Sequence, residues 1–513
     1  MSSVCRPKVF ARRRTLLLET KRTSALLDDA VLCIDQGTTN SKAVLLNRRG
    51  HIIARSSSAL TISHPQPGWV EQSADDIWSS VVEAIKLCIE QVPSTNITAI
   101  GLSNQRESVV RWDAKSGKPI GPTITWQCRR TANETEKLKA DGCADEVLTK
   151  TGLPLDPLFP ATKIRWLLDL EGGNNNCIGT VDSWLIWKLT AGKCFATDRS
   201  NASRTQLMNL KTGEWDTELC SLFGVNPDVL ATVTDSQHQF GHTKSVPNLP
   251  DGVPVASAIG DSHAALFGHA AFLPGEAKAT FGTGSSVMMI SPELVVPSGG
   301  MTTTIAWSID GRITYALEGN ILVSASLFPW VANLLGLDGD VDKLMELAAT
   351  VETANGVSLV PALVGLGAPH WNPQARGILT GISFASTPAH VAHAAALSMS
   401  LQVVDVFHAM HKQAPANGGR IFVDGGPTKN KFLMQQLANL LSQPVTVSVE
   451  SELSALGAGM LAGLSTGFWT SLDEIESLDR DRVTIVPTMA EQDRSTIISI
   501  WNNAILKCTH ANG

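Results

Sequence analysis

Three short turns in this chain combine residue types that suit phosphate chemistry. They are Asp35-Gln36-Gly37-Thr38-Thr39 with Asn40 and Lys42 after it, Phe281-Gly282-Thr283-Gly284-Ser285, and Asp424-Gly425-Gly426 with Asn430 after it. An aspartate that ends a strand can hold Mg²⁺, because hard cations take oxygen ligands. Glycine lets the backbone approach a phosphate closely, threonine offers donors, and lysine adds positive charge. One such turn is typical of a hairpin, but three of them across both halves of the chain predict nucleotide binding.

The common phosphate-binding motifs are missing from the sequence. No G-x-x-x-x-G-K-[ST] occurs, since Gly117-Lys118 is followed by proline, and no G-x-G-x-x-G follows an apolar run. The H-R-D and D-F-G elements of protein kinases are also missing. A nucleotide site in this chain must therefore use another kind of loop.

The first turn lies between elements that read as strands. Apolar runs at 31–34, 43–46 and 51–54 predict a β-meander whose first corner is the turn at 36–39. Apolar residues recur every three or four positions from Ile77 to Val92, which predicts a helix with Ser73 as its N-cap. A further strand at 97–102 runs into Ser103-Asn104-Gln105-Arg106-Glu107.

The second half repeats the alternation of strands and helices. We interpret 236–254 as a surface connection and 259–271 as the opening of the second half, with strands within 279–290, 300–316 and 420–423 and helices at 389–410, 429–441 and 454–464. Both halves contain a strand that ends in aspartate before a glycine turn, at Asp35 and at Asp424. We therefore predict an α/β protein made by duplication of one unit, with a boundary near residue 270.

Composition limits the classes of function. The 513 residues carry a formal charge of −7 and include 43% apolar residues, enough for large cores. Residues 1–27 hold seven basic residues and one acidic residue, a charge of +6, which leaves −7 − 6 = −13 on the rest of the chain. This acidic body is a poor match for nucleic acid, whose phosphates require a basic surface. No run approaches about 20 apolar residues, which excludes a membrane span. Nine cysteines with no C-x-x-C spacing argue against disulfides and structural zinc and favour a reducing, cytoplasmic location.

The basic leader, residues 1–29, allows two interpretations. It is rich in arginine and poor in acidic residues, as a mitochondrial transit peptide would be. The alternative is a disordered tail, and the composition does not choose between them.

Several further motifs occur in a recognisable order. They are Asn104-Gln105-Arg106-Glu107, Trp126-Gln127-Cys128-Arg129-Arg130-Thr131, Gly179-Thr180-Val181-Asp182-Ser183-Trp184-Leu185, Asn201-Ala202-Ser203-Arg204-Thr205, Gly260-Asp261 and Gly365-Leu366-Gly367-Ala368-Pro369. With the three turns, they resemble the FGGY family of carbohydrate kinases, most of all its glycerol kinase branch, from about residue 30 to 505. The resemblance implies two duplicated ATPase domains of the actin and hexokinase (ribonuclease H-like) type around a cleft, at 30–270 for acceptor and phosphates and 271–513 for nucleotide.

The resemblance also implies an activity and roles for single residues. The activity is transfer of phosphate from ATP to glycerol with Mg²⁺, which gives sn-glycerol 3-phosphate; a homodimer or homotetramer is compatible with it. The general base would be Asp261, and Asp35 and Asp261 would associate with Mg²⁺. Glycerol would lie against Arg106, Glu107, Trp126, Asp261 and Ser262. The phosphates would lie against Thr38, Thr39, Asn40, Lys42, Gly282 and Thr283, and the nucleoside against Gly426 and Asn430.

The chain departs from the glycerol kinase pattern mainly around the acceptor. Leu158 replaces a tyrosine that contacts glycerol, Ser262 replaces a glutamine, and Ser286 replaces a phenylalanine wall, while Pro329 replaces a glutamine near the adenine. Each unpaired buried hydroxyl of the acceptor would cost roughly 1–3 kcal/mol. Two alternatives therefore stay open beside glycerol: a kinase for another small polyol or sugar, and a catalytically weak nucleotide-binding regulator.

Overall fold

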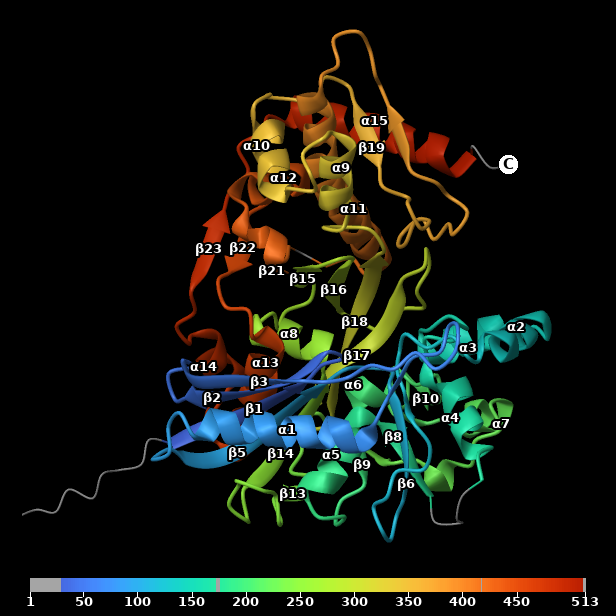
Figure 1. Ribbon diagram of the computed structural model, residues 1–513, viewed down its shortest axis with the longest axis vertical. Coiled ribbons are helices and arrows are strands. Elements are labelled where there is room, and N and C mark those ends of the chain that lie inside the picture. Colours follow the sequence, from blue (N-terminus) through green and yellow to red (C-terminus); the bar gives the residue numbers. More distant parts are fainter. Residues whose placement is uncertain (1–28, 172–175, 417, 511–513) are drawn as a thin grey trace, which may run out of the picture.

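Two β-sheets, one above the other in Figure 1, organise the computed structural model of the protein, which describes residues 29–171, 176–416 and 418–510. The basic leader, except for Asp29, lies outside the described residues. The first sheet has the order β13-β14-β5-β1-β2-β3. Its strands are Gly241–His242, Pro254–Gly260, Asn96–Asn104, Asp29–Gln36, Asn40–Asn47 and Ile52–Ala59. The predicted meander is confirmed as β1-β2-β3, and all four residues of the run at 31–34 are buried.

The second sheet repeats the pairing of the first. Its order is β17-β18-β16-β15-β21-β22-β23, with strands Thr302–Ile309, Arg312–Ile321, Ser285–Ser291, Ala277–Phe281, Ile421–Gly425, Val445–Ser448 and Arg482–Ile485. In each sheet an antiparallel meander (β1-β2-β3, β15-β16-β18) is followed by two parallel strands (β5 and β14, β21 and β22). This equivalence supports duplication.

The two turns that suggested the duplication are nevertheless not counterparts. Asp35 lies on β1, whose equivalent in the second sheet is β15, whereas Asp424 lies on β21, the equivalent of β5. The pairing of whole strands, and not the local Asp-Gly sequence, decides which positions correspond. The true counterpart of the first turn is therefore the β15–β16 turn around Gly282.

Helices α8 (Asp261–Gly268) and α13 (Leu453–Thr466) form a layer between the sheets. They pack so closely that a Cβ on Gly457 of α13 would collide with the carbonyl oxygen of Ala264 on α8. The segment 259–271 contains the end of β14, which belongs to the first sheet, and the helix α8. The interpretation that this segment opens the second half was therefore wrong. The helix α13 comes late in the chain but packs on β1, β5 and β14 of the first sheet, and the boundary near residue 270 stays a prediction.

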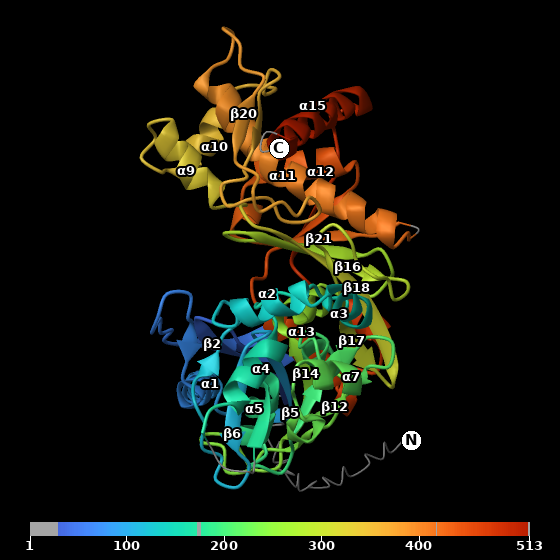
Figure 2. The ribbon, with the colours of Figure 1, turned by 90° about the vertical axis from the view of Figure 1, so that its right-hand side faces the viewer.

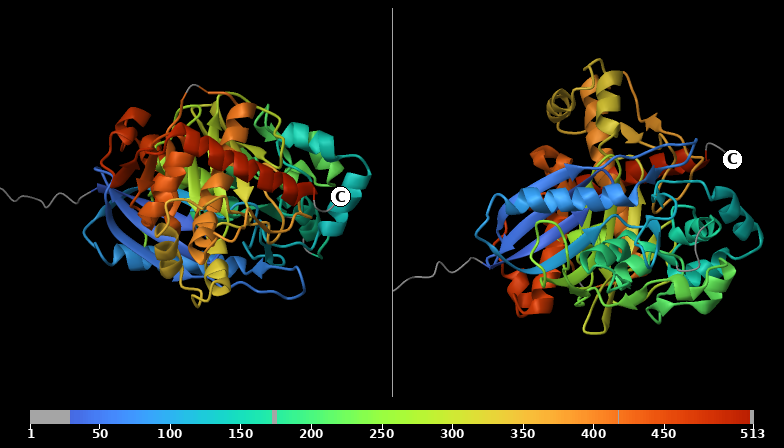
Figure 3. Two further views of the ribbon diagram at one scale, coloured as in Figure 1. Left: turned by 90° about the horizontal axis from the view of Figure 1, so that it is seen from above. Right: turned by 60° about the horizontal axis from the view of Figure 1, so that its bottom comes forward.

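The outer faces of both sheets are covered by further helices, as Figures 2 and 3 show. The first sheet carries α1 (Ala74–Ile89) and α5 (Val181–Leu189). The predicted N-cap of α1 is confirmed, since Ser73 Oγ accepts a hydrogen bond from the amide of Asp76. The second sheet carries α11 (Pro388–Gln413) and α12 (Lys431–Leu441), with α9 (Leu327–Leu334), α10 (Val341–Ala349) and α15 (Glu491–His510) further out.

Smaller elements fill the edges of the molecule. A four-stranded sheet contains β4 (Glu71–Gln72), β7 (Thr123–Ile124), β6 (Val109–Asp113) and β8 (Asn176–Thr180). Three pairs are β10 (Met208–Asn209) with β11 (Glu214–Trp215), β9 (Ala196–Asp198) with β12 (Thr232–Thr234), and β19 (Ser358–Val360) with β20 (Ile378–Thr380). The remaining helices are α2 (Ala132–Ala140), α3 (Ala144–Thr151), α4 (Pro160–Leu168), α6 (Arg199–Ala202), α7 (Thr217–Leu222) and α14 (Leu472–Glu476), with 3₁₀ turns at Pro227–Val229 and Gly426–Lys429.

Two findings bear on the class of protein. None of the helices in the described part of the chain is long and apolar enough to span a lipid bilayer. The eight cysteines within the described residues are all free thiols.

Candidate active site

A cavity of about 680 Å³ lies where the two sheets and the inner helices meet. It is lined by nine of the predicted site residues, namely Asp35, Thr38, Lys42, Arg106, Glu107, Trp126, Asp261, Ser262 and Gly282. Thr39, Asn40, Thr283, Gly426 and Asn430 are not part of its wall, but each belongs to one of the three predicted turns. The structure therefore brings together residues separated by more than 200 positions.

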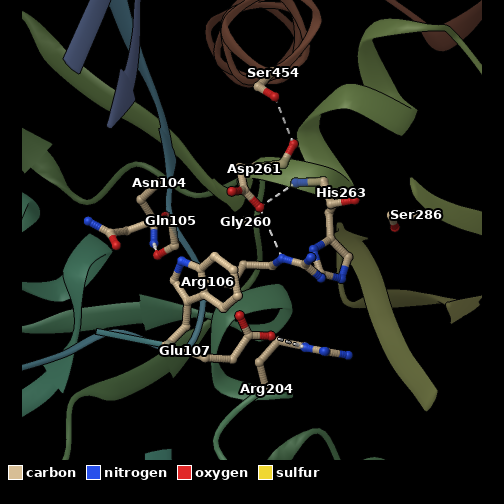
Figure 4. Close-up of polar contacts among 12 residues, drawn as sticks. Asn104, Gln105, Arg106, Glu107, Arg204, Gly260, Asp261, His263, Ser286 and Ser454 are labelled. Atoms are coloured by element: carbon tan, nitrogen blue, oxygen red, sulfur yellow. Dashed lines mark hydrogen bonds and ion pairs between the residues drawn. The ribbon is translucent and has the colours of Figure 1, made fainter. Parts of the chain in front are cut away.

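Asp261 begins α8, with Gly260 as its N-cap. Its Oδ1 accepts hydrogen bonds from Arg106 Nε at 3.0 Å and from the amide of Ser262 at 2.6 Å (Figure 4). No donor among the described residues reaches Oδ2, and the side chain is 39% exposed to the cavity. A Cβ at position 260 would lie 2.8 Å from Arg106 Cδ, which explains the glycine. One oxygen is thus fixed and the other is free to accept a proton.

Alternating charges run from Asp261 into the protein. Arg106 donates two hydrogen bonds to Glu318, at 2.9 and 3.1 Å, and Arg204 contacts the same carboxylate at 3.2 Å and Glu107 at 2.6 Å. Glu318 is completely buried. Burial raises the pKa of Glu318, but the two guanidinium groups outweigh burial and hold it well below its usual range. The predicted acceptor residues Arg106 and Glu107 are therefore held rigidly, and Arg106 keeps two N–H groups for an acceptor.

A buried lysine fixes the main chain that carries Trp126 and Leu158 of the cavity lining. Lys163 of α4 donates to the main-chain oxygens of Thr125 at 2.9 Å, Trp126 at 3.2 Å and Leu158 at 2.7 Å. Burial lowers its pKa to about 7. The indole of Trp126 donates to Thr38 Oγ1 at 3.0 Å, which joins the acceptor wall to the first phosphate turn.

The substituted acceptor positions all line the cavity. Ser286 donates to Glu318 Oε1 at 3.2 Å, whereas the buried hydroxyl of Ser262 has no partner in the described part of the chain. Leu158 presents an apolar side chain to the same space. Pro329 lies exposed in α9 and outside the cavity wall. The three substituted positions therefore present small or apolar side chains to the cavity, and one of their hydroxyls has no partner within the described residues.

The first turn places Asp35 and Lys42 at the cavity. Ser103 donates to Asp35 Oδ1 at 2.9 Å, while burial, and then the charge of Asp261, raise the pKa of Asp35 to about 6. Two carboxylates that repel one another fit a hard cation, since a cation relieves the repulsion. Lys42 is paired with Glu452 at 2.8 Å. Thr39 is exposed, and the main-chain oxygen of Asn40 closes the turn by accepting from the Gly37 amide.

The other two turns lie on the second sheet. The β15–β16 turn is held by the chain after β18, where the amides of Ser324 and Ala325 donate to the oxygens of Thr283 and Gly282. At the third turn, Gly426 is exposed and would allow a ligand close approach. Asn430 caps α12, because its Oδ1 accepts from the Leu433 amide at 3.1 Å. The nucleotide roles of these residues stay predictions.

Residues without a predicted role also belong to the site. Lys278, Glu318 and Arg204 lie at the cavity or on its ion-pair chain, as does Asp424, which His269 contacts at 2.9 Å. Lys278 and Glu318 each stand between apolar or glycine neighbours in a strand, in Ala277–Phe281 and Arg312–Ile321. A single charge within an apolar run indicates a buried ionic partner, and that signal could have identified both from the sequence.

Comparison with known proteins agrees with this geometry. Models of the FGGY family of carbohydrate kinases match residues 30–268 (N-terminal domain) and 277–466 (C-terminal domain). An apulose kinase of Pectobacterium atrosepticum is 42% identical over 93% of this chain and 98% of its own, and a glycerol kinase of Bacillus cytotoxicus is 40% identical over 93% and 99%.

Among solved structures, the glycerol kinase of Plasmodium falciparum with ADP superposes with a TM-score of 0.89 at 31% identity, over 94% of this chain and 98% of that one. Both the sequence relatives and the fold extend over nearly the whole chain, so the expected α/β architecture of two actin-like ATPase domains is confirmed. The chain belongs to the FGGY family of carbohydrate kinases and is a phosphotransferase that acts on a hydroxyl group.

Proposed function

We propose that the protein transfers the γ-phosphoryl group of ATP to a terminal hydroxyl of glycerol, which gives sn-glycerol 3-phosphate. One observation carries the proposal: no donor among the described residues reaches Oδ2 of Asp261, and Asp261 lines one cavity together with the predicted acceptor residues Arg106, Glu107 and Trp126 and with residues of the predicted phosphate turns. Glycerol is small and carries three hydroxyls, so it suits a wall that offers both donors and an acceptor beside an indole face.

The acceptor hydroxyl gives its proton to Oδ2 of Asp261 while its oxygen forms a bond to the γ-phosphorus. The bond from this phosphorus to the β–γ bridging oxygen breaks, and its electron pair leaves with ADP. The contribution of the protein is mostly alignment and charge neutralisation, and Arg106 holds the base in a fixed direction through its 3.0 Å bond to Oδ1.

Mg²⁺ fits the proposed site. Asp35 and Asp261 would hold it together with phosphate oxygens and water, because Mg²⁺ requires about six oxygen ligands. When bound, it would neutralise phosphate charge. The raised pKa of Asp35 supports a cation position, since burial and the charge of Asp261 both disfavour an unaccompanied carboxylate there.

A second acceptor class is favoured by the substituted wall. Ser262 and Ser286 leave room and hydroxyl groups where bulkier side chains stand in the glycerol kinase pattern, and Ser262 has no partner within the described residues. A relative as similar as the glycerol kinases is named as an apulose kinase. The second candidate is therefore a larger polyol or a sugar with more hydroxyls to satisfy.

A coupled assay of ADP release with a panel of polyols and sugars separates the candidates. We expect glycerol to be turned over, and Asp261→Asn to lower kcat by about 10²–10⁴-fold, which is the usual size of a general-base contribution. Glu136→Gln, at an exposed ion pair of α2, is the matched control and should change nothing. Preference for a larger acceptor would favour the second candidate, and ATP binding without turnover of any acceptor would favour a nucleotide-binding regulator instead.

A further inference from the structure

Lys278 is a buried cation at the cavity that the mechanism above does not use. It lies in the middle of β15, is 1% exposed, and its neighbours Ala277 and Ala279 belong to the core on the other face of the sheet. Burial lowers its pKa. Burying an ammonium group is unfavourable unless partners compensate, so its position requires an explanation.

The ammonium of Lys278 has unused hydrogen-bonding capacity. Within the described residues its single hydrogen bond goes to Thr280 Oγ1 at 2.9 Å, and no carboxylate lies within ion-pair distance. An ammonium group has three N–H donors, so two remain. Because Lys278 lines the cavity, these two donors are available to a ligand there.

A chain of hydrogen bonds fixes the direction of this side chain. Thr280 Oγ1 donates a hydrogen bond to Asp424 Oδ2 at 3.2 Å, and His269 contacts the same oxygen at 2.9 Å. His269 ends the helix that Asp261 begins. The lysine is therefore oriented by two residues of the second sheet and by the C-cap residue of the helix that the proposed base begins.

Lys278 also lies near charged groups from both predicted sides of the cavity. On the acceptor side, the charges of Asp261 and Glu318 act on it, and on the nucleotide side that of Asp424 does. Three residues after it along the same strand, β15 ends and leads into the Gly282 turn. Glu318 is already paired with two arginines, so Lys278 is not required to neutralise it.

We propose that the ammonium of Lys278 binds the γ-phosphoryl group of the nucleotide and follows it during transfer to the acceptor. This inference rests on the proposed use of ATP. In the step described above, the lysine exchanges no proton; it donates hydrogen bonds to the non-bridging oxygens of the moving phosphoryl group, whose charge it offsets. A role as a purely structural counterion for Asp424 is the competing explanation.

Binding of two nucleotides by calorimetry distinguishes these explanations without any turnover. The probes are Mg²⁺ with ADP and Mg²⁺ with a non-hydrolysable ATP analogue, tested on the full chain. In Lys278→Met we expect affinity for the analogue to fall about 10–100-fold, the size of a hydrogen bond to a charged group, and affinity for ADP to change less than about 3-fold. Lys211→Met, at an exposed position, is the matched control and should leave both affinities unchanged.

Equal losses for the two nucleotides, or no loss for either, would overturn the proposal. Thr280→Val leaves the charge of Lys278 in place but removes the hydroxyl that accepts its hydrogen bond. It should therefore weaken analogue binding by a smaller factor. This variant also tests the proposal if Lys278→Met does not fold. The kcat of Lys278→Met should fall about 10²–10³-fold, as for the loss of a donor to a developing charge. A wild-type chain that turns over no acceptor would refute the proposed function, whereas an active wild type with an unchanged variant would refute only the role of Lys278.

Discussion

Replacing Lys163 by methionine should weaken acceptor binding while leaving nucleotide binding intact. The substitution keeps the apolar stem in α4 and removes the ammonium that bonds the oxygens of Thr125, Trp126 and Leu158. A buried carbonyl without a partner costs about 1–3 kcal/mol. Because two of the three bonds are only partly buried and water can replace them, we expect a loss of about 3 kcal/mol in the free energy of unfolding.

The effect on catalysis follows from which segments the lysine holds. Trp126 and Leu158 line the acceptor side of the cavity, whereas Lys163 makes no hydrogen bond to the three phosphate turns. The KM for the acceptor should therefore rise by about 10-fold, equivalent to one or two hydrogen bonds. The KM for ATP should stay within about 2-fold of wild type, and so should that of Lys193→Met, an exposed control.

The pH dependence provides a second test of the same residue. Burial lowers the pKa of Lys163 to about 7, and a neutral amine has two N–H donors for three carbonyls. The acceptor KM of the wild type should thus rise about 2–10-fold between about pH 6 and pH 8.5. Between about pH 7 and 10.4 the folded lysine is neutral while the unfolded one stays charged, so the unfolding free energy contributed by this group rises with pH across that window.

Initial rates at several acceptor and nucleotide concentrations measure the two KM values, and thermal unfolding measures the loss of stability. In Lys163→Met the pH dependence of the acceptor KM should disappear, and the rise of the unfolding free energy with pH should become smaller by the contribution of this lysine. An ATP KM that rises as much as the acceptor KM, or an acceptor KM that still depends on pH in the variant, would refute the assignment of Lys163 to the acceptor wall.

Three further substitutions test other parts of the structure. Glu318→Gln removes the buried charge between two arginines and should lower the unfolding free energy by about 3–5 kcal/mol, measured by denaturant titration; a loss under about 1 kcal/mol would contradict the buried network. Gly457→Ala brings a methyl group against Ala264 and should destabilise the fold by about 1–3 kcal/mol and lower kcat through the displaced helix of Asp261; unchanged kcat at full occupancy would separate the helix packing from catalysis. Ser286→Phe fills the cavity, so kcat/KM should fall more for large acceptors than for glycerol, and an equal effect on all acceptors would place Ser286 outside the acceptor wall.

Local sequence patterns predicted the elements well but not their assembly. The strands of the first meander and the capped helix α1 follow from apolar periodicity and a serine at the right position. The inner layer does not, because its position depends on contacts between residues far apart in sequence. The close contact of Gly457 with Ala264 joins two helices that are far apart in the sequence. The same limit explains the mistaken equivalence of Asp35 and Asp424, since two similar turns can end strands with different partners.

For the site as well, residues within continuous motifs could be predicted from the sequence, and isolated residues were missed. Residues within continuous motifs, such as Arg106 and Asp261, were predicted and line one cavity. Lys278 and Glu318 were not, because neither belongs to a continuous motif and the role of each depends on charges on other elements. Both positions illustrate that an isolated charge within a buried strand is itself a signal of a functional or ionic site.

The substitutions at the acceptor wall can occur without disturbing the transfer chemistry, and the hydrogen bonds explain why. Lys163 holds the main-chain oxygen of Leu158, and the amide of Leu158 donates to Asp156 at 2.8 Å, so the backbone there is fixed whatever the side chain is. The direction of Asp261 likewise depends on Arg106 and on the backbone amide of residue 262, not on the side chain of Ser262. In the proposed mechanism, any acceptor hydroxyl that reaches Oδ2 therefore meets the same proposed base. We therefore expect acceptor preference to change through side chains at 158, 262 and 286 while Asp261 keeps its direction through Arg106 and the amide of residue 262.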